Sequence, residues 1–277
     1  MHGRIDRLLS VSFLLFATIQ PVRSACVEPA KLAHSTVSIM RHFADDEPGS
    51  RADLTGVRAT GWFLSSMTIV TAEHVTAAMN LSMDAWKPLE IVDGDGSQFI
   101  GARIQRLAGA QAEKLAVIEL QRSISNSLSF TIRKEPLVPE EPVRTIVYPA
   151  GRPQFVSGRF ARIGDSGKLT GLALLELYEG DNRLVIDHGA SGAPVLDCDG
   201  RVVAVVSNVF TQSMYWAHRE IRMSTAWGTP NVVSVPIQAL DSVSEPQSKV
   251  PEQPSSATFA HKASAADIRP DQRQVPN

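Results

Sequence analysis

The sequence has few of the residues that metal sites, disulfide scaffolds and nucleic-acid interfaces need. Of its 277 residues only two are cysteine, aromatic residues make up 6%, and the seven histidines are scattered. No CxxC pair, HExxH motif or phosphate-binding loop occurs, so neither a bound metal nor a cofactor is expected. The 27 basic side chains face 29 acidic ones, and the net charge of −2 gives no general attraction for nucleic acid.

The sequence also lacks an apolar run at its N-terminus that is long enough to span a membrane. Residues 8–19 carry no charge and are almost free of polar groups, but a spanning helix needs about 20 apolar residues. Two arginines precede this run and small residues follow it, so residues 1–24 are predicted to be a signal peptide cleaved between Ser24 and Ala25. The protein is then expected to be periplasmic or secreted, without stable membrane insertion. A membrane anchor and a lipoprotein site at Cys26 are the weaker alternatives.

The C-terminal segment, residues 241–277, lacks apolar periodicity. It contains five prolines and one aromatic residue, so it cannot bury enough apolar surface to offset its chain entropy and is predicted to be disordered. Residues 25–240 are left as the folded body. Both cysteines, Cys26 and Cys198, belong to it, and an oxidising compartment favours a disulfide between them; the alternative is two free thiols.

Apolar runs in the body are short, rich in β-branched residues and interrupted by turn residues. Strands are predicted at residues 35–40, 61–72, 88–93, 115–120, 143–148, 172–177, 183–187, 201–209 and 231–237. Turn residues at 93–96, 149–153, 164–167 and 197–200 separate many of them. Short helices are expected only after His74 and near residues 236–240. The pattern is typical of an all-β sandwich or barrel.

Two segments carry residues suited to nucleophilic catalysis. The hexapeptide GASGAP, residues 189–194, sets Ser191 between glycines in a tight turn, where the N–H groups of Gly189 and Ser191 can point at one spot. A serine hydroxyl needs a base to take its proton and donors to stabilise the oxyanion that forms. Upstream, His74 follows the apolar strand TIVTA and supplies such a base. Either segment alone is also compatible with an ordinary turn or strand end.

Five segments along the chain carry a resemblance to a known family: GWFL, TIVTAEHV, LAVIEL, VYPAGRPQFVSGRFA and HGASGAPVLDCDGRVVAVVSN. They follow one another in the order found in the bacterial trypsin-like serine peptidases of the chymotrypsin fold, and the chain resembles that family. The resemblance covers residues 33–238. It implies two antiparallel six-stranded β-barrels, in halves of about 25–135 and 136–240, with the active site at their interface. An α/β-hydrolase is disfavoured, because its nucleophile motif needs glycine where this chain has Ala193 and its histidine follows the serine.

The resemblance implies a role for each of these residues. Ser191 matches the family nucleophile, His74 the general base, and the N–H groups of Gly189 and Ser191 the oxyanion hole. The primary pocket would be formed by Val185 at its base and by Ser207, Asn208 and Val209 along its wall. None of these is a carboxylate that could pair with a substrate lysine or arginine. Protein or peptide substrates with small or medium apolar side chains before the scissile bond are therefore expected.

The chain departs from the family pattern at the third catalytic position. The family places an aspartate directly before the strand LAVIEL, and this chain has Lys114 there. A lysine cannot accept the imidazole N–H and disfavours an imidazolium. Glu113 is the candidate substitute; the alternatives are a different carboxylate, such as Asp84 or Asp187, a His/Ser dyad, or an inactive fold.

If the fold is inactive, the protein would be a peptide-binding or interaction module. Animal members of the family carry an aspartate for activation directly before the nucleophile, and Ala190 stands there, so that switch is not expected. Residues 241–277 are too few for the peptide-binding PDZ domain that similar peptidases often add.

Overall fold

The computed structural model describes residues 26–28, 32–44, 47, 56–93, 96–109, 115–166, 169–178, 189–209, 212–216, 219–223 and 230–240. It describes the backbone alone for residues 150, 166, 169, 208, 209, 212–216 and 219–223. The predicted signal peptide and the predicted tail lie outside the described residues, as does the strand predicted at residues 183–187. No helix within the described ranges is long and apolar enough to cross a bilayer.

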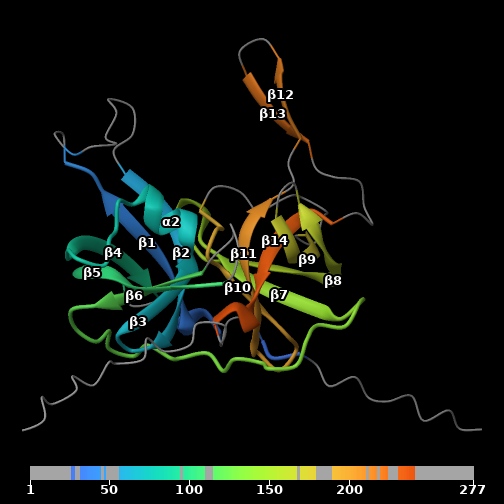
Figure 1. Cartoon of the computed structure of the whole chain (residues 1–277), viewed down its shortest axis with the longest axis horizontal. Helices are drawn as coiled ribbons and strands as arrows, with labels where there is room; N and C mark the ends of the chain where they lie inside the picture. Colours follow the sequence, from blue (N-terminus) through green and yellow to red (C-terminus); the bar gives the residue numbers. More distant parts are fainter. Residues whose placement is uncertain are drawn as a thin grey trace, which may run out of the picture. The chain divides into compact units, whose positions relative to one another are not determined.

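The N-terminal half of the chain forms a closed antiparallel barrel of six strands in the order β1-β2-β3-β6-β5-β4. Figure 1 shows this barrel in blue to green. Its strands are β1 (Thr36–His42), β2 (Gly56–Ser65), β3 (Thr68–Ala72), β4 (Lys87–Asp93), β5 (Gly96–Ala108) and β6 (Leu115–Leu120). The 3-10 helix η1 (Ala33–Ser35) leads into β1, and the helix α2 (Glu73–Ala78) follows β3.

The second half of the chain forms another closed six-stranded barrel, in the order β10-β11-β14-β9-β8-β7 (Figure 1). Its strands are β7 (Pro142–Val147), β8 (Gln154–Ser166), β9 (Leu169–Tyr178), β10 (Pro194–Leu196), β11 (Val202–Val209) and β14 (Val232–Pro236). The 3-10 helices are η2 (Pro149–Gly151) and η3 (Ile237–Leu240), and β12 (Gln212–Trp216) pairs with β13 (Arg219–Met223) in a separate two-stranded sheet. The predicted fold class, two antiparallel six-stranded barrels, is confirmed.

Strands β3 and β6 are buried on both faces, which explains their unbroken apolar sequences. Ile69 and Ile118 are paired in register and face the interior of the first barrel. Their neighbours Val70 and Val117 are also paired but belong to an apolar cluster shared with the second barrel. Because side chains alternate across a strand, residues on one face fill the barrel and residues on the other join the two barrels.

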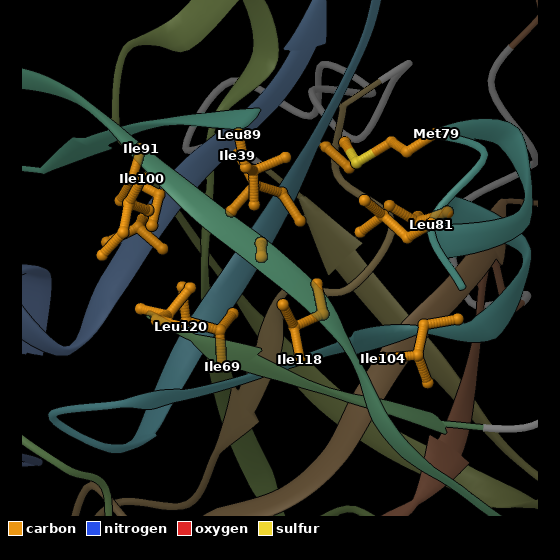
Figure 2. Close-up of a cluster of buried hydrophobic side chains, with 14 of the residues drawn as sticks. Ile39, Ile69, Met79, Leu81, Leu89, Ile91, Ile100, Ile104, Ile118 and Leu120 are labelled. Atoms are coloured by element: carbon orange, nitrogen blue, oxygen red, sulfur yellow. The ribbon is translucent and has the colours of Figure 1, made fainter. Parts of the chain in front are cut away.

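Three apolar clusters hold the molecule together. Figure 2 shows the one inside the first barrel, to which Met79 and Leu81, directly after α2, also contribute. A second cluster fills the other barrel around Phe160. The third lies between the barrels and packs Trp62 and Phe130 against Leu174 and Val205, with the two aromatic rings edge to face at 6.1 Å between centroids. The barrels therefore share a continuous apolar interface, which fixes the residues at their junction relative to one another.

The predicted disulfide is present between Cys26 and Cys198, 172 residues apart in the sequence. It ties the N-terminal segment to the turn between β10 and β11, where the Val27 N–H also donates to the Cys198 carbonyl at 2.9 Å. Closing a loop of this length removes chain entropy from the unfolded state equivalent to about 5 kcal/mol. The bridge therefore stabilises the second barrel and the adjoining N-terminal segment.

Some predicted elements differ in detail. The run at residues 61–72 is two strands, because a turn at Ser66 and Met67 splits it, and β8 was not predicted as a strand. The short helix predicted after His74 exists but begins earlier, at Glu73. The turn expected to begin at residue 164 does not begin there, because β8 continues to Ser166, which pairs with Leu169.

Candidate active site

The segment that contains Ser191 forms a tight turn directly before β10. Gly189 and Gly192 have φ angles of +99° and +89°, in the left-handed region that glycine adopts without strain. The Gly192 N–H donates to the Val206 carbonyl at 2.8 Å, and the Ala193 N–H closes the turn on the Ala190 carbonyl at 3.0 Å. The Ser191 hydroxyl, half-buried, donates to the Ser207 carbonyl at 3.2 Å.

The amides of Gly189 and Ser191 lie in this turn. Within the described part of the chain, neither the Gly189 N–H nor the Ser191 N–H donates to a backbone carbonyl. These are the two donors that the sequence predicted for an oxyanion. Both residues are half-buried, and two amides in one tight turn are suited to binding a negatively charged oxygen.

The turn rests directly on the first barrel. The Thr60 N–H on β2 donates to the Ser191 carbonyl at 3.0 Å, and the Thr71 hydroxyl on β3 donates to the Thr60 carbonyl at 2.9 Å. A Cβ at Gly192 would lie 2.0 Å from Thr71 Oγ1. The backbone of the turn is therefore in contact with β3, three residues before His74.

His74 lies in the first turn of α2, two residues after the end of β3. The neighbouring Val75 and, beyond the helix, Met79 are buried in the core of the first barrel, which leaves His74 exposed. Three residues of chain span at most about 11 Å, so His74 is held close to Thr71 and to the turn in contact with it. Among the described residues no hydrogen bond joins His74 to Ser191. Catalytic hydrogen bonds are often long in ligand-free structures and shorten with substrate.

The other predicted site residues are only partly described. Ser207 is buried on β11, and the backbone of Asn208 and Val209 continues the same strand. Val185, Glu113, Lys114 and Asp187 lie outside the described residues. Asp84 is exposed in the segment between α2 and β4. No group of three or more metal-binding side chains gathers within the ranges that the structure describes.

Tyr148, which the sequence did not single out, links the second barrel to the first beside this site. It follows β7, and its phenol donates to the Thr36 carbonyl on β1 at 3.1 Å. The side chain is buried, and burial, with a smaller contribution from the charge of Asp93, raises its pKa to about 12. The signal in the sequence was the segment VYPAG, which places an aromatic residue at a strand end.

Stability at high pH is expected to depend on Tyr148. Below pH 10 the phenol is protonated in both states; between about pH 10 and 12 the unfolded chain loses this proton while the folded protein keeps it. The free energy of unfolding should therefore fall as pH rises through this range, by roughly 2–3 kcal/mol from this group. Urea unfolding of wild type and Tyr148→Phe at several pH values measures the difference. Equal pH slopes for the two proteins would contradict the assigned pKa.

A family model described as trypsin-like peptidase domain matches residues 59–205, a stretch that contains both His74 and Ser191. The chain belongs to the trypsin-like peptidase family. Its family and its two-barrel fold are those of serine-type hydrolases, so the predicted family and enzyme class are confirmed. Such a peptidase acts on protein or peptide substrates.

Solved structures support the fold of this trypsin-like peptidase. The active form of the Rv3671c protease from M. tuberculosis aligns with a TM-score of 0.53 at 14% identity, over 86% of this chain and 92% of that one. The inactive form of the same protease gives a TM-score of 0.51 at 15% identity, over 76% of this chain and 88% of that one. At these identities the similarity is one of fold. The comparison with curated proteins finds no match.

Proposed function

We propose that this trypsin-like peptidase is an exported endopeptidase in which Ser191 is the nucleophile and His74 the general base. The observation that carries the proposal is the contact between the turn at residues 189–192, which contains Ser191, and the end of the strand that leads to His74. The proposed nucleophile and oxyanion donors belong to the second barrel, and the proposed base belongs to the first. The apolar interface between the two barrels supports their relative positions.

The reaction follows from these positions. Ser191 Oγ bonds to the peptide carbonyl carbon while its proton passes to His74, and the N–H groups of Gly189 and Ser191 hold the resulting oxyanion, each worth on the order of 3 kcal/mol. As the C–N bond breaks, His74 delivers the proton to the leaving amine and an acyl-enzyme remains. A water molecule, deprotonated by His74, then hydrolyses the ester.

Glu113 is proposed as the group that orients His74. Ala72 at the end of β3 pairs with Leu115 at the start of β6. His74 follows Ala72 by two residues, and Glu113 precedes Leu115 by two residues, so the two segments diverge from the same paired position. Lys114, the residue where the family has aspartate, favours the second candidate function, a catalytically impaired protein that binds peptides without cleaving them.

Substrate preference is proposed to be for small or medium apolar residues before the scissile bond. By its resemblance to the family, Val185 would lie at the base of the pocket and Ser207, Asn208 and Val209 along its wall, and none of them bears a charge. Without a carboxylate there, burying a substrate lysine or arginine would leave its charge unpaired.

Export is proposed with cleavage between Ser24 and Ala25. The disulfide supports it, because such bonds form and persist in oxidising compartments. The bridge also occupies the sulfur of Cys26, the atom that a lipid anchor would need. N-terminal sequencing of the mature protein should therefore begin at Ala25; a start at Met1 would contradict the proposal.

Labelling with a fluorophosphonate probe tests the function. The mature wild-type protein is expected to become covalently labelled, because the probe phosphonylates a serine whose proton can be removed and whose oxyanion is stabilised. Ser191→Ala should remove the labelling, and Ser157→Ala, which changes an exposed serine on β8, controls for other hydroxyls. Gel fluorescence and the mass of the modified peptide give the result.

Labelling that persists in Ser191→Ala would overturn the assignment of the nucleophile. A wild-type protein that is folded but never labelled would favour the peptide-binding function instead. A peptide library incubated with unlabelled wild-type protein then reports specificity, and cleavage mainly after lysine or arginine would contradict the apolar pocket.

A further inference from the structure

The side chain of Thr60 on β2 joins the first barrel to the turn that presents the oxyanion donors. Its hydroxyl donates to the Gly189 carbonyl at 2.6 Å and accepts from the Tyr148 N–H at 3.0 Å. Its backbone N–H holds the Ser191 carbonyl at 3.0 Å. The residue is fully buried, with 0% of its surface exposed. One residue of the first barrel therefore binds the turn at both ends of the Gly189–Ser191 segment.

These contacts restrain the residues whose amides would bind the oxyanion. Because a peptide unit is planar, holding the Gly189 and Ser191 carbonyls fixes the peptide planes that follow these two residues. The Cα atoms from which the two donor N–H groups extend are thereby held in position. Gly189 needs such a restraint more than most residues, because glycine has wide conformational freedom and its φ here is +99°. Donors aimed at the developing oxyanion stabilise it only if they do not have to reorient.

We propose that Thr60 is a positioning residue for the oxyanion-binding turn, acting through its hydroxyl. This inference rests on the proposed peptidase function. A hydroxyl both donates and accepts, which is what the Gly189 carbonyl and the Tyr148 N–H require. Valine has nearly the same shape but can do neither, and would leave both groups buried without a partner. Serine keeps the hydroxyl and loses only a methyl group.

The test compares Thr60→Val with Thr60→Ser and with a matched control. Thr145 on β7 is also buried, but among the described residues its hydroxyl has no hydrogen-bond partner. Thr145→Val therefore makes the same chemical change as Thr60→Val without removing a hydrogen bond. Steady-state hydrolysis of a peptide substrate is measured for each protein, with the affinity for a peptide boronate, which forms a tetrahedral adduct, and for a non-cleavable peptide of the same sequence.

Thr60→Val is expected to lower kcat by about 10-fold to 100-fold with little change in KM, because the misplaced donors act on the transition state. Affinity for the boronate should fall with kcat, while affinity for the non-cleavable peptide stays near that of wild type. Thr60→Ser should restore most of the activity, and Thr145→Val should match wild type. If valine prevents folding at position 60, Thr60→Ala lacks the same hydroxyl without the added methyl group. It is expected to show the same losses of kcat and of boronate affinity, with the affinity for the non-cleavable peptide unchanged.

Three results would overturn the inference: unchanged kcat in Thr60→Val, equal losses of affinity for boronate and peptide, or no recovery in Thr60→Ser. A wild-type protein without peptidase activity would refute the proposed function separately. Hydrogen exchange of the peptide covering residues 189–192 then still tests the positioning. Exchange should be several-fold faster in Thr60→Val than in wild type and Thr145→Val, and equal rates in all three would refute it.

Discussion

Replacing Ser191 by alanine is expected to lower kcat/KM for peptide hydrolysis by about 10⁴-fold or more, and His74→Ala should cost about as much. The reason is that the two residues act in one step: His74 removes the proton of Ser191 as the serine oxygen attacks, so losing either residue abolishes that step. The double variant should therefore be little slower than either single variant. KM should change little, because the pocket residues are intact. Initial rates on one fluorogenic peptide give all four values.

His42→Ala is the matched control for the histidine. His42 is half exposed on β1, and its imidazole pairs with Glu90 at 2.6 Å, outside the site. This variant should keep wild-type kcat/KM. If the fold-losses of kcat/KM in the two single variants multiplied in the double variant, Ser191 and His74 would act independently. Full activity in Ser191→Ala would mean that another residue is the nucleophile.

The same assay decides how His74 is oriented. If Glu113 accepts the imidazole N–H, Glu113→Gln should lower kcat by about 10³-fold to 10⁴-fold, because the amide favours the wrong tautomer and cannot stabilise the imidazolium. Asp84→Asn, which changes an exposed carboxylate, should have little effect. A Glu113→Gln variant as active as wild type would favour a His/Ser dyad.

The strand pattern was sufficient to predict an all-β sandwich or barrel where strands are buried on both faces, and the resemblance to the family implied that there are two barrels. The run LAVIEL at β6 has apolar residues toward the barrel interior and toward the second barrel, so its signal is continuous. Strand β8 was missed because its buried residues, such as Val156 and Phe160, are separated by glycines and arginines such as Arg159. The turn at Ser66 and Met67 was missed because it contains no glycine, proline, asparagine or aspartate, and serine is a weaker turn signal than these.

The site could be predicted only as far as a motif extends along the chain. Ser191 and His74 stand in segments with recognisable neighbours. Thr60 was visible as a polar residue before an apolar run, but the hydrogen bond to Gly189 joins positions 129 residues apart. Tyr148 reaches Thr36 across 112 positions in the same way. Contacts of this kind depend on how two barrels dock, which no local pattern encodes.

Gly192→Ala is expected to damage both stability and activity, because the turn has no room for a side chain. The added Cβ would lie 2.0 Å from Thr71 Oγ1 and 2.1 Å from the Thr60 carbonyl oxygen, and the φ of +89° is itself strained for alanine. Together these should lower the free energy of unfolding by about 2–5 kcal/mol. The turn can relieve the clash only by moving off the first barrel, which would displace Ser191, so kcat/KM should fall at least about 100-fold.

Gly171→Ala separates the clash from the backbone strain. Gly171 on β9 has a φ of +71°, but a Cβ there would meet nothing within 4 Å. This variant should lose only about 1 kcal/mol of stability and keep wild-type kcat/KM. Guanidinium unfolding and peptide hydrolysis of both variants give the comparison. If Gly192→Ala costs no more than Gly171→Ala, the nucleophile turn does not rest on Thr71. A large loss of activity confined to Gly192→Ala instead ties catalysis to the contact between the two barrels.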